Sequence, residues 1–98
     1  NQYMTSAEYE KALTLPRTLK AIAYLLENQA LEKSLPKAQL QIENAIKEDS
    51  MWEYLELLDA RELHPITEET RDFSILGAYH VGKTRLIDNQ LVRAHARK

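Results

Sequence analysis

Two strand-like runs near the end of the sequence are separated by little more than the dipeptide Gly82-Lys83, and this spacing constrains the fold more than any other feature. The runs cover residues 73–81 and 84–89. A connection this short joins only antiparallel neighbours, because a parallel pair needs a crossover of about a dozen or more residues. The sequence therefore predicts an antiparallel hairpin.

A further strand is predicted upstream of the hairpin, where the apolar pattern takes a period of two. Leu55 and Leu57 face one way, and Tyr54 and Glu56 face the other. Aromatic residues in this run suit a pleated surface. The polar residues 59–71 then connect this strand to the hairpin.

The first half of the chain carries helix signals. Thr5 and Glu8 form a capping-box pattern, which predicts that a helix begins directly after Thr5. Pro16 would break this helix but suits the first turn of a second one, which would be entered at Thr14 or Leu15. Two helices in tandem are therefore expected.

A third helix is predicted from Ser34, with Pro36 close behind it, to about Lys47. The second and third helices each carry an apolar stripe, which is typical of helices buried on one side. The stripes consist of Leu15, Leu19, Ile22 and Leu26 in the second helix and of Leu35, Ala38, Ile42, Ala45 and Ile46 in the third.

Together these elements predict an α+β fold, a two-layer domain in which about three helices pack on a small antiparallel sheet of about three strands. A chain of 98 residues can bury one modest core, so residues 1–98 are expected to form a single domain.

Composition excludes several classes of function. The 13 Lys and Arg residues against 15 Asp and Glu residues give a net charge of -2, and no segment gathers enough positive charge to follow a nucleic acid backbone. The absence of cysteine excludes disulfides, thiolate metal sites and thiol nucleophiles. No apolar run approaches the roughly 20 residues of a membrane helix, so we expect no membrane association and a cytoplasmic location.

Residues Gly77–Thr84 match the phosphate-loop pattern G-x-x-x-x-G-K-[ST] letter for letter. In a true phosphate loop, the turn follows a buried parallel strand and opens a helix whose N-terminus meets the phosphates. Here the following residues, 85–89, are strand-like, and Lys83 is better interpreted as a turn residue. A small nucleotide-binding protein stays a minor alternative, which predicts a helix after Lys83.

Three histidines, His64, His80 and His95, are the only imidazoles. Their spacings match none of the short intervals that place ligands around zinc, so no metal site is expected. We interpret them as a turn residue, a strand residue near the hairpin and a residue of the C-terminal tail, in that order.

Carboxylates alternate along the first predicted strand as Glu53, Glu56 and Asp59. Paired carboxylates can perform acid–base chemistry when their pKa values differ, but alternation with apolar residues is also what a half-solvated sheet requires, and we favour this second interpretation. Arg85 and Asp88 are expected on opposite faces of the last strand. No set of nucleophile, base and orienting residue is apparent.

The run from residue 81 to residue 89, Val-Gly-Lys-Thr-Arg-Leu-Ile-Asp-Asn, preceded by Tyr54–Asp59, resembles the C-terminal region of pantothenate synthetases. Residues 1–5 are similar to the segment that follows a Ser-Arg pair in that family. The resemblance spans nearly the whole chain and is strongest in the hairpin.

The resemblance implies a function. That family couples pantoate to β-alanine with ATP and magnesium, through a pantoyl adenylate, and produces pantothenate for coenzyme A synthesis. A Rossmann-like N-terminal domain performs the chemistry, and the C-terminal domain closes over it as a lid. This chain is similar to the lid alone, so its partner would be the N-terminal domain of the same polypeptide, in an enzyme that forms homodimers.

On this resemblance, residues 1–98 contain no catalytic residue, and the isolated chain is expected to be inactive and to bind neither ATP nor magnesium. Asn1 is the one cofactor-binding candidate, because it would follow the Ser-Arg pair that grips the ATP phosphates. The alternative is a freestanding α+β protein-interaction module that shares the hairpin by coincidence.

Overall fold

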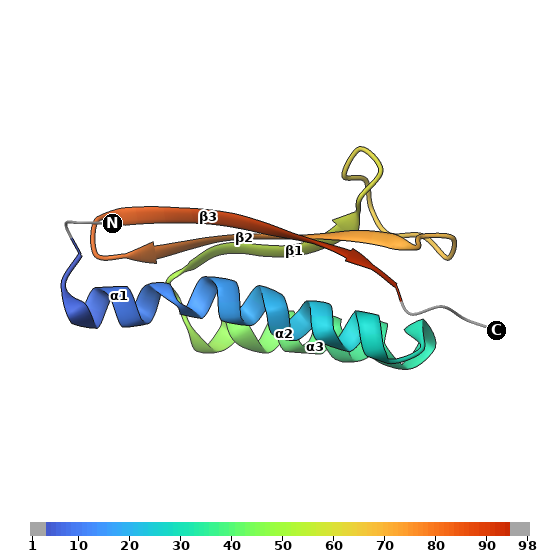
Figure 1. Cartoon of the computed structure of the whole chain (residues 1–98), viewed down its shortest axis with the longest axis horizontal. Coiled ribbons are helices and arrows are strands. Elements are labelled where there is room, and N and C mark those ends of the chain that lie inside the picture. Colours follow the sequence, from blue (N-terminus) through green and yellow to red (C-terminus); the bar gives the residue numbers. More distant parts are fainter. Residues whose placement is uncertain (1–3, 95–98) are drawn as a thin grey trace.

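The computed structural model describes residues 4–94 and has a layer of helices beneath a layer of strands (Figure 1). The elements in chain order are α1 (Ser6–Ala12), α2 (Thr14–Asn28), α3 (Leu31–Glu48), β1 (Trp52–Asp59), β2 (Asp72–Val81) and β3 (Thr84–Arg93). The strands form one antiparallel sheet in the order β1-β2-β3. None of the helices in the described part of the chain has the length and apolar character needed to cross a membrane.

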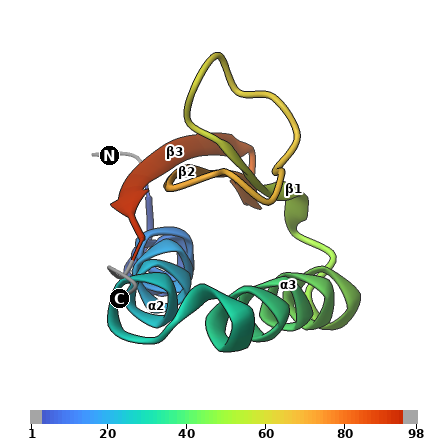
Figure 2. The same ribbon diagram turned by 90° about the vertical axis from the view of Figure 1, so that its right-hand side faces the viewer.

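The prediction that about three helices pack on the sheet is corrected by the structure, because the layer that covers the sheet consists of two. The long helices α2 and α3 lie side by side along it (Figures 1 and 2), with α2 against β2 and β3 and α3 against β1. The short helix α1 precedes α2 and has no buried residue. Its seven residues, SAEYEKA, contain too few apolar side chains to form a stripe.

The predicted starts of the first two helices are confirmed. At the start of α1, the Thr5 hydroxyl accepts the Glu8 N–H at 3.1 Å, and the Glu8 carboxylate accepts the Thr5 N–H at 3.0 Å. The second helix begins at Thr14, with Pro16 in its first turn, where the missing N–H costs no hydrogen bond. The capping box therefore predicts the local structure correctly.

The predicted start of the third helix is wrong. α3 begins at Leu31 rather than Ser34, and Pro36 lies inside the helix. Its N-cap residue, Ala30, has no side chain that can cap, but the earlier start places Leu31 in the core with 7% of its surface exposed. Burial of this side chain compensates for the missing cap, a tertiary effect that the start signal did not contain.

The hairpin is confirmed, and its second strand is longer than predicted. Val81 pairs with Thr84 on either side of the turn, where Gly82 has a φ of 58°, a conformation that favours glycine. Pairing continues four residues beyond Asn89, to Arg93.

The first strand contains an irregularity at its start. Trp52 pairs with Tyr79 and Tyr54 pairs with Ala78, so Glu53 is an extra residue with no partner on β2. Such a β-bulge bends the strand locally and changes the direction of a side chain.

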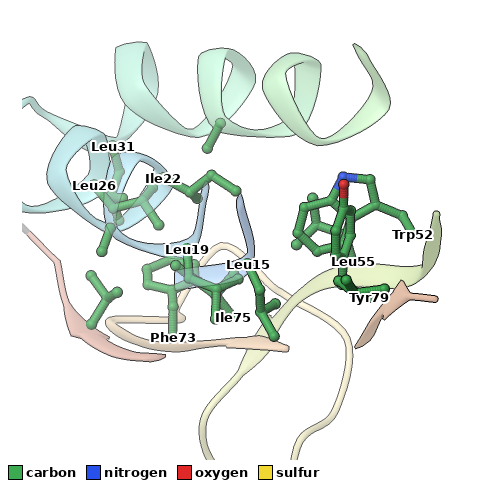
Figure 3. Close-up of a cluster of buried hydrophobic side chains, with 14 residues drawn as sticks. Leu15, Leu19, Ile22, Leu26, Leu31, Trp52, Leu55, Phe73, Ile75 and Tyr79 are labelled. Atoms are coloured by element: carbon green, nitrogen blue, oxygen red, sulfur yellow. The ribbon is translucent and has the colours of Figure 1, made fainter. Parts of the chain in front are cut away.

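The core lies between the helices and the sheet (Figure 3). The predicted stripe of α2 is confirmed, since its four residues are all buried, whereas Ile46 of the predicted α3 stripe is 44% exposed. The rings of Trp52 and Tyr79 meet edge to face, with centroids 4.8 Å apart. At Gly77 a Cβ atom would lie 2.9 Å from Leu15 Cδ1, so glycine allows α2 to approach β2 closely. The fully buried large side chains include Leu19, Ile22, Leu26, Phe73 and Ile75.

Candidate functional site

The sheet has one face against the helices and one face away from them. Phe73, Ile75, Tyr79 and Val81 of β2 are buried against the helical layer, so the alternate residues of β2 and their partners on β1 and β3 point away from it. We call this second surface the open face. It comprises Glu53, Tyr54, Glu56 and Leu58 of β1, Asp72, Ser74, Leu76, Ala78 and His80 of β2, and Arg85, Ile87, Asn89, Leu91 and Arg93 of β3.

The connection between β1 and β2, residues 60–71, rises on the side of the open face at one end of the sheet (Figures 1 and 2). The β2–β3 turn lies at the opposite end. The open face therefore has a loop end and a hairpin end.

A cluster of three charged or titratable side chains lies at the hairpin end. Arg85 donates two hydrogen bonds to the Glu53 carboxylate, from Nε to Oε1 at 2.7 Å and from the terminal nitrogen to Oε2 at 3.1 Å. The His80 Nε2 atom lies 2.9 Å from the same Oε1 atom. We call these residues the Glu53 cluster. Its geometry follows from register, since His80 and Arg85 are direct partners and the bulge directs Glu53 toward both.

The electrostatics of the Glu53 cluster keep the carboxylate ionised. Hydrogen bonds from Arg85 and then from His80 lower the pKa of Glu53 to about 2, and the same ion pair raises the pKa of Arg85 above its ordinary value. A carboxylate with such a pKa cannot act as a general acid near neutral pH, and both of its oxygens already have hydrogen-bond partners in the sheet. The cluster is therefore suited to holding three strands in register and to presenting a charge-balanced surface.

The other predicted carboxylates do not join the Glu53 cluster. Asp59 lies six residues further along β1, about 20 Å away at the usual rise of a strand. It is 7% exposed and accepts hydrogen bonds from Thr70 Oγ1 at 2.6 Å and from the Arg61 N–H at 2.9 Å. These bonds, that of Thr70 first, lower the pKa of Asp59. Glu56 is exposed on the open face between the two. The three carboxylates thus form no acid–base pair.

The histidines are also separate. His64 lies in the loop 4.0 Å from Glu62, His80 belongs to the Glu53 cluster, and His95 lies outside the described residues, as does the cofactor candidate Asn1. Within residues 4–94, no group of three or more His, Asp or Glu side chains is placed to hold a metal ion.

The phosphate-loop interpretation of Gly77–Thr84 is wrong. These residues form the end of β2, the turn and the first residue of β3, and the residue after Lys83 begins a strand rather than a helix. Most of them pair with β1, β3 or both, so their backbone N–H groups do not converge on an anion as they do in a phosphate loop. Lys83 is a turn residue, as the sequence indicated. Arg85 and Asp88 lie on opposite faces of β3, also as predicted.

Between its two ends, the open face carries an apolar patch formed by Tyr54, Leu58, Leu76, Ile87 and Leu91. Ile87 and Leu91 are 59% and 68% exposed. A second ion pair, Arg93 with Asp72 at 3.6 Å, lies at the loop end. The patch is therefore flanked by the Glu53 cluster on one side and by this pair on the other. The patch was not predicted from the sequence because the last strand was expected to end at Asn89. The hairpin register, continued beyond Asn89, places Leu91 on the same face as Ile87.

Comparison with known proteins gives one consistent result. The sequence model of a family described as pantoate-beta-alanine ligase matches residues 1–91. The pantothenate synthetase of Ruthia magnifica subsp. Calyptogena magnifica is 37% identical over 90 residues, which is 91% of this chain and 31% of that protein. The pantothenate synthetase of Clostridium novyi (strain NT) is 36% identical over 91 residues, again 91% of this chain and 31% of the relative.

A third relative, the pantothenate synthetase of Lysinibacillus sphaericus (strain C3-41), is 34% identical over 92 residues, or 93% of this chain and 32% of that protein. The chain thus spans about a third of the length of the relatives it matches.

Proposed function

This chain belongs to the pantoate-beta-alanine ligase family, and from that membership we propose that it is the C-terminal lid of an ATP-dependent ligase that condenses pantoate with β-alanine. In this proposal the reaction passes through a pantoyl adenylate and yields pantothenate for coenzyme A synthesis. The lid itself contributes no catalytic residue. ATP and magnesium bind to the remaining part of the enzyme, with Asn1 at its border.

The family match over residues 1–91, on a chain that spans about a third of its relatives, carries the proposal. A match of this extent is more than one shared hairpin, so we do not retain the interaction-module alternative. A ligase that activates one substrate with ATP and joins it to another needs sites for three molecules. Within the Glu53 cluster, the polar side chains bind each other, and Asp59 is likewise bound by its neighbour Thr70. This pairing supports a role of the chain outside the chemical steps.

A lid has a definite physical task in this reaction class. An acyl adenylate is attacked by water as well as by an amine, and closure over the cleft excludes water from the intermediate. Removal of water also strengthens the electrostatic interactions between the enzyme and the phosphates. A rigid two-layer unit is suited to this movement, because it closes as one body.

The proposal includes the partners of the lid. These are the N-terminal catalytic domain of the same polypeptide and, through it, pantoate, β-alanine and ATP. The full-length enzyme would be a homodimer in the cytoplasm, held together mainly by the catalytic domains.

Titration and assay of the isolated chain test the lid proposal. We expect no stoichiometric heat at micromolar Mg-ATP in a calorimetric titration, and no AMP when pantoate and β-alanine are added. The pantothenate synthetase of Ruthia magnifica, assayed in parallel, serves as the positive control. Stoichiometric ATP binding, or AMP formation that depends on both substrates, would contradict a non-catalytic lid.

A further inference from the structure

Exposed apolar side chains are spread over separate helices on the helical surface but lie on one strand on the open face. On the helical surface, the large exposed side chains include Tyr24 of α2, 67% exposed, and Leu40 of α3, 56% exposed, which lie on separate helices among charged residues. On the open face, Ile87 and Leu91 belong to the same strand, and the register places Ala78 directly beside Ile87 and Ser74 directly beside Leu91.

The apolar residues of the open face lie mainly in two rows of cross-strand neighbours. Tyr54, Ala78 and Ile87 form one row of cross-strand neighbours, and Leu58, Ser74 and Leu91 form a parallel row. The two rows are about 14 Å apart at the usual strand rise, and between them lies a third row of Glu56, Leu76 and Asn89, in which only Leu76 is apolar. Ala78 and Ser74 lie in the middle of the two rows and are only 0% and 3% exposed, so the larger neighbours close over them.

The dimensions of the open face fit a docking surface. Three strands of about ten residues present about 450 Å² on one face, so burial against a partner would remove about 900 Å² in total, within the range of domain interfaces inside one chain. Exposed apolar side chains that gather on one face and are rimmed by polar residues, as Ile87 and Leu91 are, are typical of interaction sites.

The charged groups at both ends of the patch are already paired. Burial of an unpaired charge at an interface is costly, but the Glu53 carboxylate holds two donors and Asp72 holds Arg93. A partner can therefore contact either end without burying an unpaired charge, whereas Glu56, which is exposed in the middle of the open face, requires a hydrogen-bond donor or a cation on the partner. The paired ends also fix the orientation in which a partner with complementary polar groups docks.

We propose that the open face is the surface by which this chain docks on the rest of the ligase, with Tyr54, Ile87 and Leu91 as its apolar contacts. This inference rests on the proposed function. The partner that covers the open face is the two thirds of a family ligase that this chain does not match. A lid excludes water from the cleft in that part only if it packs against it. The helical layer then faces solvent.

The test uses a chimera in which this chain replaces the matching third of the Ruthia magnifica enzyme. Ile87→Glu and Leu91→Glu place a charge on the patch, and Leu40→Glu and Tyr24→Glu are matched controls on the helices, with nearly equal exposure. We expect the patch substitutions to lower kcat/KM by about tenfold or more, since each buries an unpaired charge at the interface, and the controls to leave it within about twofold.

Thermal melts of the 98-residue chain with each substitution separate docking from folding, and equal melting temperatures in all four variants are expected because the sites are exposed. Full activity of both patch variants in an active chimera would overturn the docking surface and leave the proposed function intact. An inactive chimera with an unmutated lid would contradict the proposed function itself.

Sedimentation of the isolated chain tests whether a second copy of the chain covers the open face instead. A dimer that Leu91→Glu dissociates would also overturn the proposal.

Discussion

Arg85 on β3 holds Glu53 on β1 through two hydrogen bonds that cross the central strand, although the two residues are 32 positions apart in the sequence. The two residues thereby connect the outer strands of the sheet at its hairpin end. The contact forms because the bulge on β1 lies opposite the first residues of β3 after the turn. The Arg85–Glu53 contact therefore depends on the register of all three strands.

The first prediction concerns acid stability. The folded pKa of Glu53, about 2, lies below its ordinary value of 4.5, so its ion pair stabilises the fold fully above about pH 5 and loses this effect as the pH falls from 4.5 toward 2. Glu53→Gln should therefore be less stable than the wild type at pH 7, and the difference should vanish near pH 2. Urea denaturation at a series of pH values measures it.

The matched control for this prediction is Glu56→Gln on the same strand and the same face, where no hydrogen-bond partner lies among residues 4–94. It should change the free energy of unfolding little at either pH. A Glu53→Gln deficit that stays constant from pH 7 to pH 2 would show that the deficit arises from packing rather than from charge.

The hairpin turn provides a second prediction. Gly82 has a φ of 58°, and a Cβ placed on it would lie 2.5 Å from Glu8 Oε2 on α1. Gly82→Ala should lower the free energy of unfolding by about 1–3 kcal/mol, through backbone strain and this contact together. In a Glu8→Ala background the same substitution should cost less, because only the strain remains. An equal cost in both backgrounds would show that the Glu8 side chain does not lie against the turn.

The close approach of α2 to the sheet gives a third prediction. Gly77→Ala adds a methyl group 2.9 Å from Leu15 Cδ1 and 3.1 Å from Trp52 Cζ3, and should destabilise the fold by about 1–3 kcal/mol. When it is combined with Leu15→Ala, the new methyl group occupies part of the vacated space, so the double variant should lose less stability than the sum of the single variants. Strict additivity, measured by chemical denaturation, would contradict this packing.

A fourth prediction concerns the loop that rises over the open face. Asp59 anchors residues 60–71 by accepting hydrogen bonds from the Thr70 hydroxyl and the Arg61 N–H, and these bonds lower the pKa of its carboxyl group. Asp59→Asn should speed hydrogen exchange in the loop at pH 7, and so should Thr70→Val, because the Thr70 hydroxyl both donates to Asp59 and accepts the Thr67 N–H at 3.0 Å. Exchange that is unchanged in Asp59→Asn would mean that other contacts hold the loop.

Local signals predicted a large part of the fold. Gly82-Lys83 determines the hairpin because a two-residue turn has few conformations, and Thr5 with Glu8 determines the start of α1 because a capping box involves neighbours in sequence. The start of α3 could not be found in this way. It depends on the burial of Leu31 against residues distant in the chain, which outweighs the signal at Ser34.

The candidate site was less accessible to sequence analysis. Glu53 was correctly expected on a strand among polar positions, but its partners depend on a bulge that changes the register of β1 against β2 by one residue. No local pattern in the strand indicates that bulge. Pairing of His80 with Arg85, by contrast, follows from counting outward from the turn.

The activity of the unmutated chimera tests the central claim most directly. The account predicts that the Ruthia magnifica enzyme carrying this chain in place of its matching third forms pantothenate from pantoate, β-alanine and Mg-ATP, whereas the same enzyme without that third does not close and forms little. Pantothenate production by the chimera no faster than by the truncated enzyme would contradict the assignment of this chain as the lid of such a ligase.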